Sequence, residues 1–380
     1  MKTYDFLIIG AGSAGCSMAY FLQKENKSVA LIDREGIAGG ASGAAGAFLS
    51  PLPGKKNSYN SLVNAALEYS LDFYEKLLSK AVDKKGVLRV ADSNFDEKKL
   101  SQNSIKHKYL DSKKLHEISK NFMNIDGFFY ENAAVIDPLQ ICLELTKKCD
   151  FYKRDVKELC FKDGFYTIDD IKARSIILAQ GVSSSLVEIP YMKISPIFGL
   201  RVDVKTTTKV PFNIHKSISV STNKQDGTIS IGATQQRHDD EKMECLTTCD
   251  KCAYYINSDE VQIATLLKQA EELIKLEDLE VVKTYKGARA TIKSYFPVIG
   301  KVVDYERSLK KHPSIKNGTK IPPEMLEYYP NMYLINALGS RGFVYGPYLA
   351  KILTKSILHN ETMPKEVSTE KLFYKAARKN

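Results

Sequence analysis

Three glycines near the start of the chain, Gly10, Gly12 and Gly15, have the spacing of a turn that binds a dinucleotide. Such a turn lets the backbone approach a pyrophosphate closely, and the N-terminus of the following helix offers free N–H groups to the anion. Asp33 lies 18 residues after Gly15. A carboxylate at about this distance accepts hydrogen bonds from ribose hydroxyls. These four residues therefore predict a dinucleotide site, for either FAD or NAD.

The stretch that follows Asp33, "REGIAGGASGAAGAFLSPLPG", consists largely of small residues. Nicotinamide enzymes usually continue from the ribose-binding acid into the next strand and helix, whereas small residues let the backbone approach a large, flat ligand. Gly39, Gly40 and Gly43 leave space for an extended dinucleotide, and Ser42 can donate to a phosphate oxygen. This stretch favours FAD over NAD, with a flexible loop as the alternative.

Cys245, Cys249 and Cys252 form a C-x3-C-x2-C run in "CLTTCDKC", a spacing that resembles the cluster motif of radical S-adenosylmethionine enzymes. Those enzymes carry the motif early in a barrel, but here it lies in a charged segment after a predicted strand. A metal site would also need a fourth ligand, for which His238 is a candidate, or an open position. We interpret the run as reduced thiols and expect no metal.

The glycines and Asp33 are expected on a strand–helix–strand unit. Residues 4–9 form an apolar run typical of a buried parallel strand, residues 16–24 have helical spacing, and residues 28–32 read as a second strand. Strand and helix patterns alternate in 1–80 and 137–190. Strand alternation dominates 85–136 and 191–300, with one helix predicted in "SDEVQIATLLKQAEELIKL".

Composition indicates a folded enzyme-sized chain. Its 380 residues are 43% hydrophobic, which argues against disorder, and the apolar stretch near the N-terminus is only one strand long and lacks a signal-peptide pattern. Seven cysteines, an odd number, suit reduced thiols, so we expect a cytoplasmic protein with no membrane association. The net charge of +10 favours a polyanionic partner, although lysine-rich proteomes also give basic enzymes that bind no nucleic acid.

The chain resembles the D-amino acid oxidase superfamily of FAD enzymes. Four landmarks occur in the expected order: "IIGAGSAG" with "LIDRE", then "GGASG", "ARSIILAQG" and "NALGSRGFVYGPYLA". The resemblance implies an α/β fold with a Rossmann-like FAD-binding domain (1–84, 137–190 and 331–380) interleaved with a mixed-sheet substrate domain (85–136 and 191–330). It implies an FAD-binding set: Gly10, Gly12, Ser13, Ala14, Gly15, Asp33, Arg34, Gly40, Ala41, Ser42, Ala47, Val156, Ala179, Gly181, Gly339, Ser340, Arg341, Gly342 and Phe343.

Within this superfamily the chain is similar to the FAD-dependent half of the bifunctional tRNA 5-methylaminomethyl-2-thiouridine biosynthesis enzymes. The similarity lies in "GGASGAAGAFLSP", "GARATIKSYFPVIGKVVDYE" and above all "NALGSRGF", where related amino acid oxidases commonly have a histidine. The chain departs from the pattern at Ala44, Ala45 and Ser294, and Phe198 with Arg201 disrupts the usual Pro-Val-Arg-Gly. A separate methyltransferase is then a possible partner, because the dinucleotide motif starts at residue 10 and we expect no methylation by this chain.

The narrower resemblance implies removal of a carboxymethyl group from an amine on a wobble uridine of tRNA. That side chain is an N-substituted glycine, so the site needs a cation for its carboxylate. Arg289 is the first candidate because a guanidinium can donate two parallel hydrogen bonds to one carboxylate. The alternative role for Arg289 is a buried structural ion pair. Arg201 is a second candidate cation, and Lys293 a candidate for assisting oxygen reduction, unless it is simply solvated. The anticodon base would need an apolar pocket, with Phe343 and Tyr345 as candidates.

Two other functions fit the same residues. A free small amino acid such as glycine, sarcosine or a D-amino acid would use the same flavin and the same carboxylate clamp. A flavin-containing RNA-binding or assembly protein without turnover is the alternative from another class. Reduction of the flavin by an amine distinguishes an enzyme from such a protein.

Overall fold

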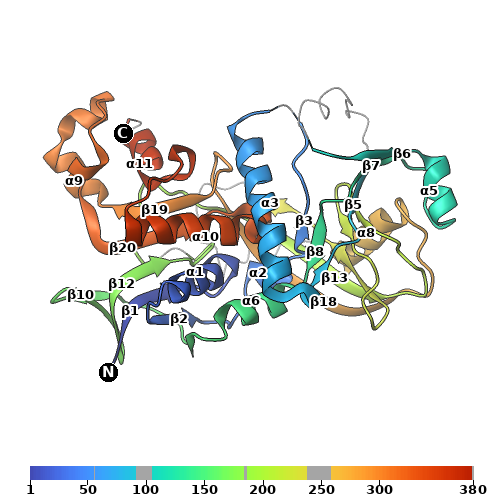
Figure 1. Cartoon of the computed structure of the whole chain (residues 1–380), viewed down its shortest axis with the longest axis horizontal. Coiled ribbons are helices and arrows are strands. Elements are labelled where there is room, and N and C mark those ends of the chain that lie inside the picture. The colour runs from blue at the N-terminus through green and yellow to red at the C-terminus, as the bar shows by residue number, and fades with distance from the viewer. Residues whose placement is uncertain (55, 91–104, 184–185, 238–257, 379–380) are drawn as a thin grey trace. The chain divides into compact units, whose positions relative to one another are not determined.

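The computed structural model begins with the predicted strand–helix–strand unit, β1 (Lys2–Ile9), α1 (Ser13–Lys24) and β2 (Val29–Asp33) (Figure 1). It describes residues 1–54, 56–90, 105–183, 186–237 and 258–378. The chain divides into two units. Unit 1 comprises Met1–Gly39, Cys142–Pro196 and Arg289–Asn380, and unit 2 comprises Gly40–Ile141 and Ile197–Ala288.

Unit 1 is built on an eight-stranded mixed sheet whose centre is parallel. Strand β1 lies between β2 and β12 (Ile171–Leu178), both parallel to it, and β12 also pairs in parallel with β20 (Tyr328–Asn336). The remaining strands are β9 (Asp150–Lys153), parallel to β2, and the antiparallel β10 (Cys160–Lys162), β11 (Phe165–Ile168) and β19 (Val298–Val303). Central strands are apolar along most of their length because helices and loops cover both faces.

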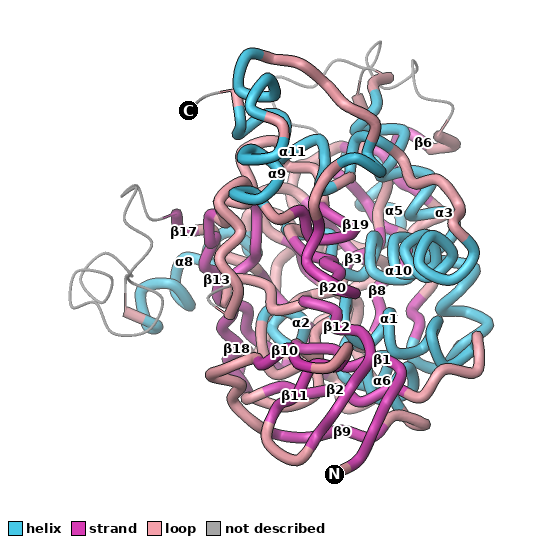
Figure 2. Tube along the Cα trace, turned by 90° about the vertical axis from the view of Figure 1, so that its left-hand side faces the viewer, coloured by secondary structure: helices cyan, strands magenta, loops and turns pink. Residues whose placement is uncertain are grey.

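The helices of unit 1 include two long ones, α1 and α10 (Gly342–His359), which lie side by side in Figure 1. The shorter ones are α6 (Pro138–Thr146, whose first turn belongs to unit 2), α9 (Tyr305–Lys311), α11 (Thr369–Ala377), and the 3-10 turns η2 (Pro313–Asn317), η3 (Pro323–Met325), η4 (Gly339–Arg341) and η5 (Lys365–Val367). Figure 2 shows α9 and α11 side by side at one end of this unit.

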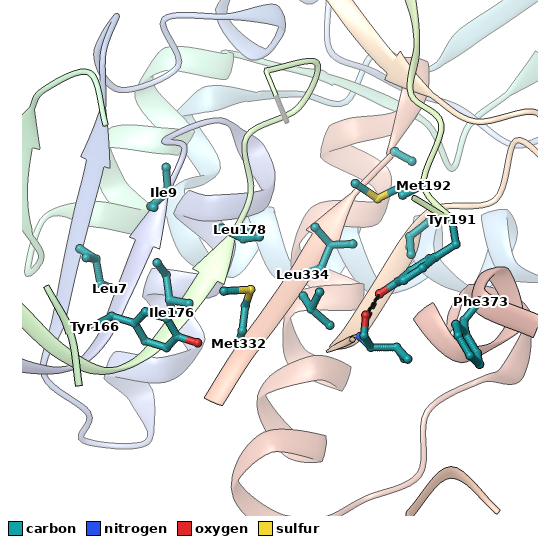
Figure 3. Close-up of a cluster of buried hydrophobic side chains, with 14 of the residues drawn as sticks. Leu7, Ile9, Tyr166, Ile176, Leu178, Tyr191, Met192, Met332, Leu334 and Phe373 are labelled. Carbon is teal, nitrogen blue, oxygen red and sulfur yellow. Dashed lines mark hydrogen bonds between the residues drawn. The ribbon is translucent and has the colours of Figure 1, made fainter. Parts of the chain in front are cut away.

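The core of unit 1 joins the sheet to its last helix. Leu7, Ile176 and Leu334 come from three neighbouring strands, and Phe373 comes from α11 (Figure 3). Tyr191 is 6% exposed and its hydroxyl is hydrogen-bonded to the backbone of Val303, which satisfies its polar end inside the core. These contacts fix α11 against the sheet.

Unit 2 is built on a nine-stranded sheet and a small three-stranded one. The large sheet runs β17 (Gln236–Arg237), β13 (Ser195–Lys205), β16 (Thr228–Gly232), β15 (Ser219–Val220), β14 (Asn213–His215), β5 (Val87–Val90), β7 (Gly127–Tyr130) and β6 (Lys108–Leu110), with β18 (Glu280–Thr291) on β13. The small sheet contains β3 (Phe48–Leu49), β8 (Ala134–Ile136) and β4 (Val82–Asp83). Its helical segments are α2 (Ala41–Ala44), α3 (Ser58–Leu78), η1 (Ser79–Ala81), α5 (Ser112–Ile118) and α8 (Asp259–Glu271).

The unit boundaries differ from the domain boundaries expected from the sequence. Residues 289–330 were expected in the substrate domain but belong to unit 1, because β19 pairs with β20 in its sheet. Residues 40–84 were expected with the dinucleotide motif but belong to unit 2, where β3 and β4 pair with β8. Both differences come from pairings between segments that are distant in sequence.

Among the described residues, no helix has both the length and the apolar character needed to cross a membrane.

Candidate functional site

The glycine turn of unit 1 is shaped by backbone contacts that leave no room for side chains. A Cβ at Gly15 would lie 1.8 Å from the carbonyl oxygen of Gly10, and one at Gly10 would lie 2.3 Å from the carbonyl oxygen of Ala179. Gly10 also has a φ of +106°, which L side chains rarely adopt. The turn therefore requires glycine at both positions, and it brings the first and third sequence landmarks together.

The side chain of Asp33 connects the end of β2 to this turn through hydrogen bonds. Its carboxylate accepts hydrogen bonds from the backbone N–H groups of Ala11 (2.8 Å), Glu35 (2.8 Å) and Gly36 (3.1 Å). The sequence predicted a ribose acceptor, which stays a prediction, but it did not predict this second role. Ala11 was missed because its side chain signals nothing; only its backbone is used.

The starts of α1 and α10 lie against each other. A Cβ at Gly342 would lie 2.8 Å from Oγ of Ser13, and one at Gly346 would lie 3.1 Å from the Ser13 carbonyl oxygen. Neither helix has a side-chain N-cap or an acidic residue in its first turn. Two helix N-termini, each with a positive dipole end, thus come together at the predicted dinucleotide site.

The other predicted cofactor residues of unit 1 surround this region with different exposures. Ala179 and Phe343 are buried, Ser340 and Arg34 are exposed, and the rest of the set is buried or half-buried: Gly12, Ala14, Val156, Gly181, Gly339 and Arg341. Arg34 donates to the hydroxyl of Ser183 at 3.2 Å. Phe343 and Tyr345 are only 4% and 1% exposed, so these rings belong to the core and leave little surface for a base.

Asn336 connects the third and fourth landmarks and was missed by the sequence analysis. Its side-chain Nδ2 donates to the carbonyl oxygen of Gly181 at 2.9 Å, and its side-chain Oδ1 accepts from the N–H of Ala337 at 2.7 Å. Asn336 is 3% exposed. The only signal in the sequence is a polar residue at the end of an apolar strand, which is common at sites of this kind.

In unit 2, the small-residue stretch forms the short helix α2 and the segment that leads into β3. No atom lies within 4 Å of a Cβ built at Gly40, and the neighbouring Ala41 and Ser42 are half-buried. Ala47 is 9% exposed and has a φ of +48°, a left-handed conformation that is uncommon for alanine. Strained backbone of this kind clusters at functional sites, which supports the prediction that Ala47 belongs to the FAD-binding set.

Arg201 lies in a buried polar network of unit 2. The side chain is 6% exposed, its Nη1 lies 3.4 Å from Oδ1 of Asp203 and donates to Ser230, and its guanidinium stacks on the ring of Tyr285 at 3.9 Å. Lys224 contacts the other oxygen of Asp203 at 2.8 Å. Asp203 is thus shared by two cations, so its single negative charge offsets the charge of Arg201 only in part. The role of Arg201 as a second substrate cation stays a prediction.

Strand β18 carries Gly287 in unit 2 and ends in unit 1 with Arg289 and Thr291. A Cβ at Gly287 would lie 2.8 Å from Cα of Ala41 in α2, and a Cβ at Gly339 would lie 3.4 Å from Cγ2 of Thr291. Gly287, Arg289 and Thr291 share one face of the strand because side chains alternate. Burial lowers the pKa of the Arg289 guanidinium, the direction expected for a cation withdrawn from water. Lys293, beyond the end of β18, is exposed, which fits the solvated alternative.

The residues fit a bound dinucleotide. Gly10 and Gly15 form a cradle that any Cβ would fill, and the starts of α1 and α10 have no side-chain N-cap and no acidic residue in their first turns. The cysteine run and His238 lie outside the described residues. In the described part of the chain, Cys16, Cys142, Cys149 and Cys160 are free thiols, and no group of three or more potential ligands is placed to hold a metal.

The family model for DAO, FAD dependent oxidoreductase, matches residues 5–356. The chain therefore belongs to this family of FAD-dependent oxidoreductases. This confirms the predicted superfamily, the class of enzyme and the cofactor.

Two curated relatives carry the same name, tRNA 5-methylaminomethyl-2-thiouridine biosynthesis bifunctional protein MnmC. The protein from Legionella pneumophila (strain Philadelphia 1) is 24% identical over 92% of this chain and 54% of its own length. The protein from Campylobacter fetus is 25% identical over 93% of this chain and 56% of its own length. The chain thus spans about half the length of the curated relatives it matches.

Solved structures confirm the predicted fold class. Glycine oxidase from Bacillus cereus superposes with a TM-score of 0.72 at 18% identity, over 94% of this chain and 96% of that one. At this identity the likeness concerns the fold alone.

Proposed function

We propose that this protein oxidises the carbon–nitrogen bond of an N-substituted glycine, the carboxymethylaminomethyl group of a wobble uridine in tRNA. The proposal depends on one observation above all: Arg289 shares a face of β18 with Thr291, and Cγ2 of Thr291 lies 3.4 Å from the position of a Cβ at Gly339 within unit 1. The turn at Gly339 belongs to the predicted cofactor set.

Arg289 has the chemistry of a carboxylate clamp. Burial lowers the pKa of its guanidinium, but arginine is so strong a base that it keeps its charge in proteins. A cation withdrawn from water gains more from a carboxylate than an exposed one would, and a planar fork holds both oxygens in a fixed orientation. Clamping the carboxylate also fixes the adjacent methylene carbon, which must be positioned for reaction.

Bound FAD supplies the hydride acceptor for that methylene carbon. The residues of the glycine turn and the start of α10 would hold the cofactor, and Arg289 would hold the substrate. The methylene carbon would lose a hydride, and the amine nitrogen would lose its proton as the C=N bond of an imine forms. Water adds to this imine, and the carbon–nitrogen bond breaks to give glyoxylate and the primary aminomethyl group.

The tRNA part of the proposal is supported by the two relatives and by the charge. Both relatives are named for tRNA thiouridine biosynthesis, and this chain matches about half of each. The net charge of +10 favours a polyanionic substrate. A free amino acid is the second candidate, since the carboxylate of glycine would suit Arg289 equally and the fold resembles that of glycine oxidase.

Anaerobic flavin reduction tests the proposal directly. Undermodified tRNA, the isolated modified nucleoside and glycine are each mixed with the FAD-loaded protein, at low and at moderate salt, and the flavin absorbance is followed. We expect reduction by tRNA with an apparent affinity that falls steeply with salt, slower reduction by the nucleoside with little salt dependence, and none by glycine. Rapid reduction by glycine with no response to tRNA would overturn the tRNA assignment and leave the amino acid candidate.

A further inference from the structure

Helix α11 of unit 1 presents three cations on one face. Lys371, Lys375 and Arg378 are spaced four and then three residues apart, so they follow one side of the helix over roughly 10 Å. All three are exposed, whereas Phe373 and Ala377 on the other side are completely buried. We call the three cations the α11 stripe.

In the described part of unit 1, the three cations of the α11 stripe have no carboxylate partner, whereas some cations on the other helices do. On α10, Lys355 pairs with Glu361 at 3.0 Å and His359 lies 3.3 Å from Glu25. On α9, Lys311 pairs with Glu327. Within the described residues, no carboxylate lies within 4 Å of any cation of the stripe. Its charge is therefore directed to solvent and available to an anion.

The stripe begins beside the loop that follows β18. The ammonium of Lys371 lies 5.0 Å from the ring centre of Phe296, in the loop between β18 and β19. Tyr295 in the same loop is 50% exposed and has a φ of +59°, a genuine outlier for a bulky residue. An exposed aromatic ring in a strained loop, six residues after Arg289, is a candidate functional feature.

The stripe ends at a second basic turn. The guanidinium of Arg378 donates to the carbonyl oxygen of Gly318 at 2.8 Å, and its remaining N–H groups can still reach an anion. Two further exposed lysines, Lys316 and Lys320, flank Gly318. Cations thus continue from the loop after β18, along α11, to the turn after η2.

We propose that Tyr295 and the α11 stripe bind the RNA that carries the substrate, with the three cations on consecutive backbone phosphates and Tyr295 stacked on an unpaired base. The inference rests on the proposed function and assigns it a binding surface. A row of cations beside an exposed aromatic ring is the combination that binds single-stranded nucleic acid, because phosphates need charge and every base has a face for stacking.

Two triple variants test the stripe. The first is Lys371→Gln/Lys375→Gln/Arg378→Gln, and the matched control removes three exposed lysines near α5 of unit 2, Lys113→Gln/Lys114→Gln/Lys120→Gln. Binding of undermodified tRNA is measured against KCl concentration. We expect the stripe variant to bind at least about 10-fold more weakly near 0.1 M salt, with a log–log salt slope smaller by about 2. The control should change affinity less than about 2-fold.

Tyr295 is tested separately from charge. Tyr295→Ala should weaken tRNA binding by about 5-fold or more with an unchanged salt slope, and Tyr295→Phe should restore it, since stacking needs only the ring. All variants should retain FAD and wild-type flavin reduction by the free nucleoside.

Several results would overturn the inference. Equal losses in both triple variants would show that net charge alone matters, and an unaffected stripe variant would show that RNA binds elsewhere; in either case reduction by tRNA would leave the proposed function standing. A wild-type protein that neither binds tRNA nor is reduced by it would remove the proposed function together with this surface. Loss of binding to vesicles containing phosphatidylserine, with RNA binding retained, would assign the stripe to a membrane instead.

Discussion

Arg289 is the residue whose exchange should separate substrate binding from cofactor binding. Arg289→Lys keeps a positive charge but replaces a planar fork by a single ammonium, which misplaces the methylene carbon. We expect FAD to remain bound and flavin reduction by the nucleoside to slow by about 10-fold or more, measured by stopped-flow absorbance. The control is Arg307→Lys, an exposed arginine on α9. Unchanged reduction in Arg289→Lys would exclude it from the site.

Gly15 and Gly40 should respond differently to the same added methyl group. A Cβ at Gly15 would collide with the Gly10 carbonyl oxygen at 1.8 Å, so Gly15→Ala should unfold the turn, lower the midpoint of denaturation and abolish FAD binding. A Cβ at Gly40 meets nothing within 4 Å. Gly40→Ala should leave the stability of the FAD-free protein within about 0.5 kcal/mol of wild type and weaken FAD binding. Full FAD affinity in Gly40→Ala would place the cofactor away from this position.

At single residues, the sequence indicated which side chains belong to the candidate site better than it indicated their hydrogen-bond and packing partners. The glycines and Asp33 were predicted from spacing, yet the three N–H groups that Asp33 binds belong to backbone, which no side-chain pattern reveals. The ion pair of Arg201 with Asp203 was predictable, because residues two apart in a strand share a face. The burial of Phe343 and Tyr345 was not predictable, because a glycine-rich helix start does not indicate which element packs against it.

At the scale of elements, the crossing of α1 and α10 should limit the size of residue 346. A Cβ there would already lie 3.1 Å from both the Ser13 carbonyl oxygen and Oγ of Ser17. Gly346→Leu should therefore destabilise the protein by about 1 to 3 kcal/mol, despite the better helix propensity of leucine. Urea denaturation measures this, with Ser356→Leu on the half-buried side of α10 as control. Equal stability of the two variants would mean that the helices can separate at no cost.

Helices and central strands of this chain were predictable because their periodicity is local. The helical spacing of 16–24 corresponds to α1 at Ser13–Lys24, and the helix predicted in "SDEVQIATLLKQAEELIKL" is α8 at Asp259–Glu271. The assignment of 289–330 to unit 1 was not predictable, because it depends on β19 pairing with β20 across a segment with its own helix and turns. Periodicity identifies a strand but not its neighbour.

For the whole molecule, stability should fall on acidification below about pH 4. Among the described residues, hydrogen bonds to the carboxylate lower the pKa of seven carboxyl groups. The carboxyl groups and their donors are Asp5 with Ser28, Glu131 with Lys108, Asp150 with Tyr4, Asp155 with Lys157, Asp170 with Arg154, Asp226 with Thr228, and Glu327 with Lys311. A depressed carboxyl pKa stabilises the fold above the unfolded value near about 4, and this contribution is lost as pH falls through the folded value.

Urea midpoints between pH 7 and pH 3 measure that loss. Asp150→Asn should lower the midpoint at pH 7 and flatten its pH dependence, whereas Glu68→Gln, at an exposed position of α3, should leave the curve parallel to wild type. A midpoint that stays constant down to pH 3 would contradict the assignment of these carboxylates.

The contact between Ser13 and Gly342 has a consequence for how the protein is made. Its two residues lie near opposite ends of the chain, and the N-terminal unit is completed only by segments that begin at Cys142 and Arg289. During synthesis the glycine turn leaves the ribosome long before the second helix start that completes the cradle, because the segments of unit 2 are translated between them. Between the synthesis of these two segments the growing chain must therefore remain without its cofactor, and with part of its parallel sheet unpaired, a state in which partly folded chains aggregate readily.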